Sequence, residues 1–320
     1  MHNKKLNSIM IVGLGSIGRR HLKNVLALGY RNVSGVEPNK KNATAVQEEF
    51  SISVYNSLQF GLKQAKPDAV FICSPTNFHI LNAMAALRAG SHIFIEKPLS
   101  VNLKGVDNLI HLAKQKKKIA MVACNYLFHH GFQKLQKILA QKIYGKPLFC
   151  RVTVSYYLPT ARKNSNYKNL YAARKNQGGG VVLDSGSHTV NYLQNLFGKI
   201  KKSEIITSKL HSLGIQSEEA AVLVLEHANG ILSTISLDYL SKKPIHRLEV
   251  VTDRGLLILD IKDDFLVFKD GKNKKVIYKG NGGANQMFLD ELKYFFHSLK
   301  ERKKPLQDLE EAKEILKILV

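Results

Sequence analysis

A glycine-rich segment near the start of the chain has the spacing of a phosphate-binding loop. Gly13-Leu14-Gly15-Ser16-Ile17-Gly18 fits the pattern G-x-G-x-x-G, follows an apolar run and precedes a helical pattern, which is the context that this pattern requires. The first glycine allows a tight turn, the second lets the backbone approach a pyrophosphate, and the third lets helix and strand pack closely. Free N–H groups at the helix start would bind the phosphates. The segment therefore predicts a dinucleotide site that includes Gly13, Gly15, Ser16, Ile17 and Gly18.

An acidic residue stands where the ribose of the adenosine half would bind. Glu37 directly follows the apolar run 33–36. A carboxylate at the end of the second strand can accept hydrogen bonds from both ribose hydroxyls, and it would repel the 2′-phosphate of NADP. Lys40 and Lys41 follow closely and could soften that repulsion. We therefore expect NAD as the cofactor, with NADP as the less favoured alternative.

A parallel sheet is needed to position these residues. Short apolar runs alternate with helix-length stretches in the first part of the chain. The runs are residues 9–12, 33–36, 69–73, 93–95 and 119–124, and the helical patterns are residues 16–28, 77–89 and 102–116. Apolar strands separated by helices are typical of a parallel sheet covered on both faces. With right-handed crossovers, this predicts an α/β, doubly wound Rossmann domain over residues 1–125.

Further along the chain the pattern changes to long strands joined by tight turns. Asn229-Gly230, Asp253-Arg254-Gly255 and Asp270-Gly271 each separate two runs rich in strand-forming residues, which is typical of β-hairpins. Helices are expected at residues 181–197, 286–300 and 309–319. Residues 126–320 are therefore expected to form an α+β domain built on a large, mainly antiparallel open sheet.

Three further segments join the glycine-rich loop in an order typical of one protein family. They are Ser74-Pro75-Thr76-Asn77-Phe78-His79, Glu96-Lys97-Pro98 and Gly178-Gly179-Gly180-Val181-Val182-Leu183-Asp184-Ser185-Gly186-Ser187-His188. Together they resemble the glucose–fructose oxidoreductase / inositol dehydrogenase (Gfo/Idh/MocA) family over essentially the whole chain. The resemblance implies that the nicotinamide binds between a Rossmann domain and an open-sheet domain.

The resemblance also implies roles for individual residues. It makes Lys97, Asp184 and His188 the catalytic set, and it implies a cis peptide bond between Lys97 and Pro98. It assigns cofactor contacts to Ser74, Pro75, Asn77, His79 and Glu96. Asn77 could instead cap the helix that follows it.

The chemistry of the catalytic set agrees with these roles. Oxidation of an alcohol requires removal of the hydroxyl proton as hydride leaves carbon, and histidine suits this near neutral pH. Asp184 lies one helical turn before His188 on an expected helix, so the two share one face, and Asp184 can orient His188 or hold a second substrate hydroxyl. Lys97 follows a parallel strand at its carboxyl end, where open α/β sheets bind ligands, and can stabilise a developing alkoxide.

Two departures from the family pattern concern the substrate pocket. Asn191 stands where family members often have an acidic residue after the motif histidine. The segment Asn125-Tyr126-Leu127-Phe128-His129-His130 lacks the arginine and the proline that often follow the sixth strand. Asn125 can still contact the substrate, in a pocket that differs from those of the sugar dehydrogenases that keep these residues.

A basic segment without acidic residues precedes the glycine triplet. Residues 158–177 carry Arg162, Lys163, Lys168, Arg174 and Lys175. Arginine binds phosphate or carboxylate bidentately, and tyrosine can stack on a base or a sugar. We therefore expect an anionic substrate, a nucleotide sugar or a sugar acid, contacted by Tyr157, Arg162 and Arg174 together with Lys97, Asn125, Asp184 and His188. The alternative is that the segment only shares the basic bias of the chain.

That bias is strong, with 48 Lys and Arg against 25 Asp and Glu and a formal net charge of +23. Such a charge can indicate nucleic-acid binding, but the basic clusters do not alternate with aromatic residues as in single-strand binding faces, so no nucleic-acid partner is expected. Cys73, Cys124 and Cys150 form neither a disulfide framework nor a CxxC pattern, which favours a cytoplasmic protein without a metal site. We expect no membrane-spanning segment.

The sequence thus predicts an NAD(H)-dependent oxidoreductase that interconverts a secondary hydroxyl and a ketone on a sugar-like small molecule. A homo-oligomer, dimer or tetramer, is expected as in relatives. One alternative is an NAD-dependent glycosidase that uses transient oxidation, and net NADH formation would distinguish it. The other is a non-catalytic dinucleotide-binding regulatory protein, against which the intact Lys97, Asp184 and His188 argue.

Overall fold

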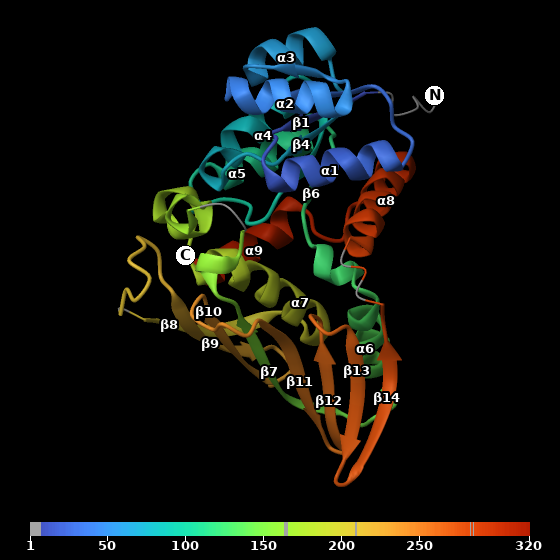
Figure 1. Cartoon of the computed structure of the whole chain (residues 1–320). Helices are drawn as coiled ribbons and strands as arrows, with labels where there is room; N and C mark the ends of the chain where they lie inside the picture. Colours follow the sequence, from blue (N-terminus) through green and yellow to red (C-terminus); the bar gives the residue numbers. More distant parts are fainter. Residues whose placement is uncertain (1–7, 163–165, 209, 282, 284) are drawn as a thin grey trace. The chain divides into compact units, whose positions relative to one another are not determined.

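The computed structural model describes residues 8–162, 166–208, 210–281, 283 and 285–320, which fold into two compact units (Figure 1). Unit 1 comprises Met1–Ala123 and Phe288–Ile318 with Val320, and unit 2 comprises Cys124–Met287 with Leu319. The C-terminal helices therefore belong to unit 1, whereas the sequence analysis grouped all of residues 126–320 in one domain.

Unit 1 is built on a six-stranded parallel sheet with the order β3-β2-β1-β4-β5-β6. The strands are β1 (Ile9–Val12), β2 (Val33–Val36), β3 (Ser53–Tyr55), β4 (Ala69–Ile72), β5 (His92–Ile95) and β6 (Ala120–Val122). β1 and β4 are buried along their whole length, which explains their uninterrupted apolar sequences. The strand order reverses between β1 and β4, and ligands of such sheets bind at the carboxyl ends of the strands at this point.

The helices of this unit are α1 (Ser16–Ala27), α2 (Lys40–Phe50), α3 (Leu58–Ala65), α4 (His79–Arg88), α5 (Val106–Gln115), α8 (Gln286–Glu301) and α9 (Leu309–Leu319), with the short 3-10 helix η1 (Thr76–Phe78) before α4. Aromatic packing explains why α8 joins unit 1. The ring of Phe295 lies 5.6 Å from that of Phe71 and 5.3 Å from that of Phe94, and Phe295 is fully buried. Burial of these large rings in the core of the sheet, and no local pattern in the helix sequence, explains why α8 packs in unit 1.

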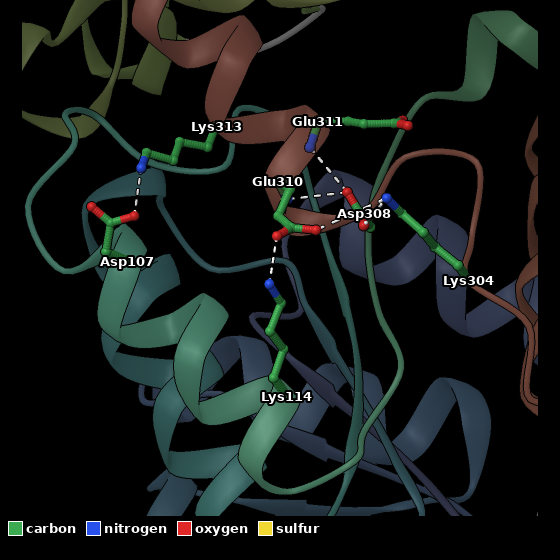
Figure 2. A network of polar contacts seen from close by, with 7 residues as sticks. All are labelled: Asp107, Lys114, Lys304, Asp308, Glu310, Glu311 and Lys313. Atoms are coloured by element: carbon green, nitrogen blue, oxygen red, sulfur yellow. Dashed lines mark hydrogen bonds and ion pairs between the residues drawn. The ribbon is translucent and has the colours of Figure 1, made fainter.

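Polar contacts around α9 attach it to α5, as Figure 2 shows. Lys114 Nζ lies 2.6 Å from Glu310 Oε1, and Lys313 Nζ lies 2.5 Å from Asp107 Oδ1. Asp308 caps α9 by accepting the N–H groups of Glu310 and Glu311. Exposed ion pairs are worth little individually, so α9 is held in unit 1 mainly by buried apolar residues such as Leu309, Ala312, Ile315 and Leu316.

Unit 2 is built on an eight-stranded sheet with the order β14-β13-β12-β11-β7-β10-β9-β8. Its strands are β7 (Pro147–Ser155), β8 (Ile200–Thr207), β9 (Ala220–His227), β10 (Leu232–Asp238), β11 (Ile245–Thr252), β12 (Gly255–Asp260), β13 (Phe265–Asp270) and β14 (Asn273–Lys279). β10 pairs with β7 in parallel, and the other neighbours are antiparallel. The expected mainly antiparallel sheet and its three hairpins are confirmed.

Helices cover one face of this sheet (Figure 1). They are α6 (His130–Ala140) and α7 (Ser187–Phe197), and α7 continues the π-helical segment η7 (Val182–Gly186). Short 3-10 helices complete the unit: η2 (Asn125–Phe128), η3 (Leu158–Thr160), η4 (Tyr167–Asn169), η5 (Tyr171–Ala173) and η6 (Lys175–Gln177). Alternate residues of β9 and β11 are buried, as expected for a sheet with one covered face. In the described part of the chain, no helix is long and apolar enough to cross a bilayer.

Candidate functional site

The glycine-rich loop joins β1 to α1 at the point where the strand order reverses. Gly13 has φ of +87°, and a Cβ added there would lie 2.7 Å from the Ser74 nitrogen. A Cβ on Gly18 would lie 1.9 Å from the Gly13 carbonyl oxygen, so only glycine lets α1 approach the loop this closely. A Cβ on Gly15, in contrast, would meet no protein atom within 4 Å. The open space therefore lies beside the residue that a pyrophosphate would approach.

The start of α1 can bind an anion. Ser16 is exposed and Ile17 is half-buried. Within the described residues, no side chain caps this helix and its first turn holds no acidic residue. Its first N–H groups have no partner inside the helix, and the helix dipole favours negative charge at this end. Both properties suit the phosphates of a dinucleotide.

Glu37 directly follows β2 and is held beside the loop by three hydrogen bonds. Its Oε2 accepts from the Leu14 nitrogen at 3.1 Å and from Asn42 Nδ2 at 2.8 Å, and its Oε1 accepts from the Asn39 nitrogen at 3.0 Å. A carboxylate has about four acceptor positions, so this arrangement leaves room for a ribose hydroxyl. Lys40 begins α2 and is exposed.

The segment 74–79 after β4 contains two buried residues, Thr76 and His79, and several accessible ones. His79 is 1% exposed, and its Nδ1 and Nε2 each lie 2.9 Å from a backbone oxygen, those of Pro98 and Ser74. Burial lowers the pKa of His79. The ring therefore joins the loops after β4 and β5 and presents little surface to a ligand. Ser74 is half-buried, and Pro75 and Asn77 are exposed. The residue at the N-cap of α4 is Phe78, so the capping alternative for Asn77 is wrong.

Glu96, Lys97 and Pro98 follow β5, and the expected cis bond between Lys97 and Pro98 is confirmed. Glu96 is buried, with Oε1 2.6 Å from Nε2 of the fully buried His21 and Oε2 accepting the Lys97 N–H at 3.2 Å. Burial alone would raise the pKa of Glu96, but the hydrogen bond from His21 and nearby positive charge hold it below its usual value. Both oxygens of Glu96 thus bind protein groups, and Lys97 is half-buried.

In unit 2, Asp184 lies in the π-helical segment before α7 and accepts three tyrosine hydroxyls. The hydroxyls of Tyr156 and Tyr239 lie 3.0 and 3.1 Å from Oδ2, and the hydroxyl of Tyr171 donates to Oδ1. Burial, reinforced by the negative charge of Asp184, raises the pKa of Tyr156 and of Tyr239 well above the usual value. Both hydroxyls therefore keep their protons. π-helical turns often occur at functional sites.

His188 lies on α7, one turn after Asp184, and rests on an aromatic side chain. Its ring centroid lies 4.7 Å from that of Tyr126 in an edge-to-face arrangement, and Tyr126 lies equally close to His246. Burial lowers the pKa of His246 to about 3, so that ring is neutral. His188 is half-buried and Asn191 is buried. Asn125, also buried, lies 3.5 Å from the sulfur of Met287 through its Nδ2.

The basic segment is fixed to the chain between β8 and β9. The Ala172 oxygen accepts from Ser217 Oγ at 2.7 Å, and the Tyr167 hydroxyl donates to the Leu213 oxygen at 3.0 Å. Arg162 is exposed, and Arg174 and Tyr157 are half-buried. Lys163 lies outside the described residues. The segment holds no acidic residue, but the half-buried Glu218 lies close to it, in the stretch between β8 and β9. Burial raises the pKa of Glu218, and the positive charge of Lys175 partly opposes this rise.

The expected site residues fall into two groups. Unit 1 holds the glycine-rich loop, Glu37, the segment 74–79, Glu96 and Lys97; unit 2 holds Asn125, Tyr157, Arg162, Arg174, Asp184 and His188. Sequence reasoning missed His21, Asn42 and Tyr239. His21 follows the glycine-rich loop by less than one turn of α1, which was an available signal, whereas nothing local marks Tyr239.

Comparisons with known proteins agree with this arrangement. Residues 7–124 match the model of an oxidoreductase family with an NAD-binding Rossmann fold, and residues 132–258 match the model of the Gfo/Idh/MocA C-terminal domain. The chain is 25% identical over 321 aligned positions to myo-inositol 2-dehydrogenase of Thermotoga maritima, covering 95% of this chain and 92% of the relative.

Solved structures have the same fold. A probable dehydrogenase from Thermotoga maritima superimposes with a TM-score of 0.79 at 25% identity, over 97% of this chain and 93% of the other. A dehydrogenase from Bordetella pertussis, solved with NADH and UDP-GlcNAcA, has a TM-score of 0.81 at 18% identity, over 97% and 92%. A UDP-N-acetylglucosamine 3-dehydrogenase from Acidithiobacillus ferrooxidans has a TM-score of 0.79 at 18% identity, over 97% and 94%.

Proposed function

The chain belongs to the Gfo/Idh/MocA family of NAD-binding oxidoreductases, and from this premise we propose that it oxidises a secondary hydroxyl of an anionic, sugar-like molecule to a ketone, or catalyses the reverse reaction. The observation that carries the proposal is the joint presence of an NAD-binding loop, Lys97 at a strand end, and the Asp184 and His188 pair. A non-catalytic dinucleotide-binding protein would need the first of these features but not the others.

The residues of unit 1 fit NAD. The open space beside Gly15 and the uncapped start of α1 would take the pyrophosphate, and the half-buried carboxylate of Glu37 would take the adenosine ribose. Ser74, Pro75 and Asn77 would contact the nicotinamide half. His79 would act from beneath the cofactor by joining the loops after β4 and β5, and Glu96 would do so by joining the end of β5 to His21 of α1. When bound, the nicotinamide supplies the hydride chemistry.

Two side chains, His188 and Lys97, would then act on the reacting hydroxyl, and Asp184 would assist them. His188 takes the proton as general base, because a neutral imidazole nitrogen can accept a proton in water near neutral pH. Lys97 donates a hydrogen bond to the same oxygen and stabilises its developing negative charge. Asp184 already accepts three tyrosine hydroxyls, so at most one of its four acceptor positions remains for His188 or a substrate hydroxyl.

The basic segment and the names of similar proteins support an anionic substrate. Arg162 and Arg174 lie on a stretch without acidic residues, and arginine binds phosphate and carboxylate in a bidentate manner. One structure of the same fold was solved with UDP-GlcNAcA, and another is named as a UDP-N-acetylglucosamine 3-dehydrogenase. The sequence relative is named for the neutral myo-inositol, which makes neutral polyols the appropriate comparison.

The substrate class is tested by steady-state kinetics with matched substrates. We expect a UDP sugar or a sugar acid to give a higher kcat/KM for NADH formation than a neutral sugar or myo-inositol. Replacing both arginines, Arg162→Ala with Arg174→Ala, should raise KM for the anionic substrate and leave KM for the neutral one unchanged. If neutral substrates react best and the double variant keeps its KM, the basic segment is only a charged surface.

A further inference from the structure

The three hydroxyls on Asp184 come from segments with different attachments. Tyr156 and Tyr239 directly follow β7 and β10, whose ends are joined by hydrogen bonds from the Tyr156 nitrogen to the Asp238 oxygen at 3.1 Å and from the Leu158 nitrogen to the Tyr239 oxygen at 3.0 Å. These two tyrosines therefore move with the sheet. Tyr171 instead belongs to η5, in the middle of the basic segment. The carboxylate thus bridges the sheet and that segment.

Main-chain contacts attach the same turn to the start of the helix that carries Asp184. The Ala172 oxygen accepts the N–H of Gly180 at 2.9 Å, and the Gly180 oxygen accepts the N–H of Asp184 at 2.9 Å. A Cβ added to Gly179 would lie 2.3 Å from the backbone carbonyl oxygen of Tyr171, so the two stretches of backbone pack closely. The turn therefore contacts Asp184 by two routes, through the backbone and through the Tyr171 hydroxyl.

A basic residue, Arg174, ends the turn that carries Tyr171. The backbone N–H of Arg174 donates to the backbone carbonyl oxygen of Tyr171 at 2.9 Å. The half-buried Arg174 guanidinium donates to Asn169 Oδ1 at 3.0 Å. An anion bound by Arg174 would replace or extend this contact with Asn169. Any adjustment of the turn would then be transmitted to Oδ1 of Asp184.

We propose that Tyr171 is a positioning residue through which the basic segment sets the orientation of the Asp184 carboxylate when an anionic substrate binds. The inference rests on the proposed function, in which Asp184 assists catalysis and Arg174 binds the anion. The torsion that orients a carboxylate is broad, so hydroxyls on both oxygens are needed to fix it. Without Tyr171, Tyr156 and Tyr239 would still hold Oδ2 while Oδ1 lost the donor from the basic segment.

The test compares two tyrosines of one segment. Tyr171→Phe removes the hydroxyl on Asp184, whereas the control Tyr167→Phe removes a hydroxyl that donates to the Leu213 oxygen. We expect Tyr171→Phe to lower kcat with an anionic substrate by roughly tenfold, as for loss of one hydrogen bond to a charged group, with KM nearly unchanged because Arg174 remains. With a neutral substrate the decrease should be smaller. Tyr167→Phe should keep kcat within about twofold of wild type.

A second measurement examines the contact without using activity. In a double-mutant cycle of Tyr171→Phe and Asp184→Asn, the decreases in melting temperature should be non-additive, because the two groups interact directly. Wild type that forms no NADH with any substrate would contradict the proposed function and leave this cycle to test the contact. An active wild type in which Tyr171→Phe behaves like Tyr167→Phe, or an additive cycle, would overturn the inference while the proposed function stands.

Discussion

The glycine-rich loop of unit 1 and the Asp184 cluster of unit 2 are built in opposite ways. The loop is made by backbone within one short stretch, where Gly13 and Gly18 satisfy steric limits that any other residue would violate. The cluster is made by side chains from positions as far apart as Tyr156 and Tyr239. A local site of the first kind leaves a motif in the sequence, whereas a site of the second kind depends on the tertiary fold.

This difference predicts how each region fails. In the loop, adding one methyl group changes either packing or ligand space, depending on which glycine is replaced. In the cluster, removing one hydroxyl leaves the fold intact and alters the orientation of a carboxylate. Substitutions can therefore separate loss of cofactor binding from loss of turnover, and the following predictions use that separation.

The largest effect is expected from the groups that act on the reacting hydroxyl, one from each unit. Lys97→Ala and His188→Ala should each lower kcat by roughly 10²-fold or more, as for loss of a general acid–base group. Affinity for NADH, measured by fluorescence titration, should change little. Either variant with turnover near that of wild type would remove its residue from the catalytic set.

Two alanine substitutions in the loop should fail differently. Gly18→Ala places a Cβ 1.9 Å from the Gly13 oxygen, so it should lower the melting temperature, as overpacking typically costs about 1–3 kcal/mol. Gly15→Ala meets no protein atom within 4 Å and its φ of −70° suits alanine, so it should keep the melting temperature and weaken NADH binding by about tenfold. Tight NADH binding by Gly15→Ala would contradict the assignment of this space to the pyrophosphate.

The buried imidazole ring of His246, which contacts Tyr126 as His188 does, should make the stability of the fold depend on pH. Burial, assisted by the positive charge of His129 and opposed by Asp260, lowers the pKa of His246 to about 3. The neutral ring therefore contributes stability that is present above the unfolded pKa of about 6.5 and is lost as pH falls toward the folded value.

His246→Gln should reduce this acid sensitivity. One pH unit below the unfolded pKa, wild type loses about 1.4 kcal/mol through this group, and the variant should lose correspondingly less. The comparison is the change in unfolding free energy from pH 8 to pH 5.5 in urea, so that any pH-independent packing defect cancels. Equal changes in the two proteins would show that His246 does not titrate as described.

The smallest effect is expected at the ribose. Glu37→Ala should narrow the preference for NAD over NADP severalfold, because it removes both an acceptor for the ribose hydroxyls and a charge that repels the 2′-phosphate. Isothermal titration calorimetry with both cofactors measures the ratio, and Glu48→Ala serves as a control that removes an exposed acid of α2. A wild-type protein that binds NADP as tightly as NAD would refute this role of Glu37.

Much of unit 1 could be predicted from sequence, because its buried strands, the glycine-rich loop and Glu37 each depend on local patterns, whereas the short and partly exposed strand β3 was missed. The membership of α8 in this unit could not, since it rests on contacts of Phe295 with Phe71 and Phe94. The burial of His79 was also unexpected, because its two backbone partners come from different loops. In unit 2 the hairpins were predictable from their turns, whereas the hydroxyl of Tyr239 reaches Asp184 only in the folded sheet.

The most direct test of the proposed function is the amount of NADH formed per molecule of substrate consumed. Purified protein is incubated with NAD and an anionic sugar substrate, NADH is followed by absorbance, and the products are identified by mass spectrometry. We predict one NADH for each ketone product, formed roughly 10²-fold more slowly by Lys97→Ala. Consumption of a glycoside without net NADH would indicate the glycosidase, and tight NADH binding without turnover of any sugar would indicate a non-catalytic protein; either result would contradict the dehydrogenase proposed here.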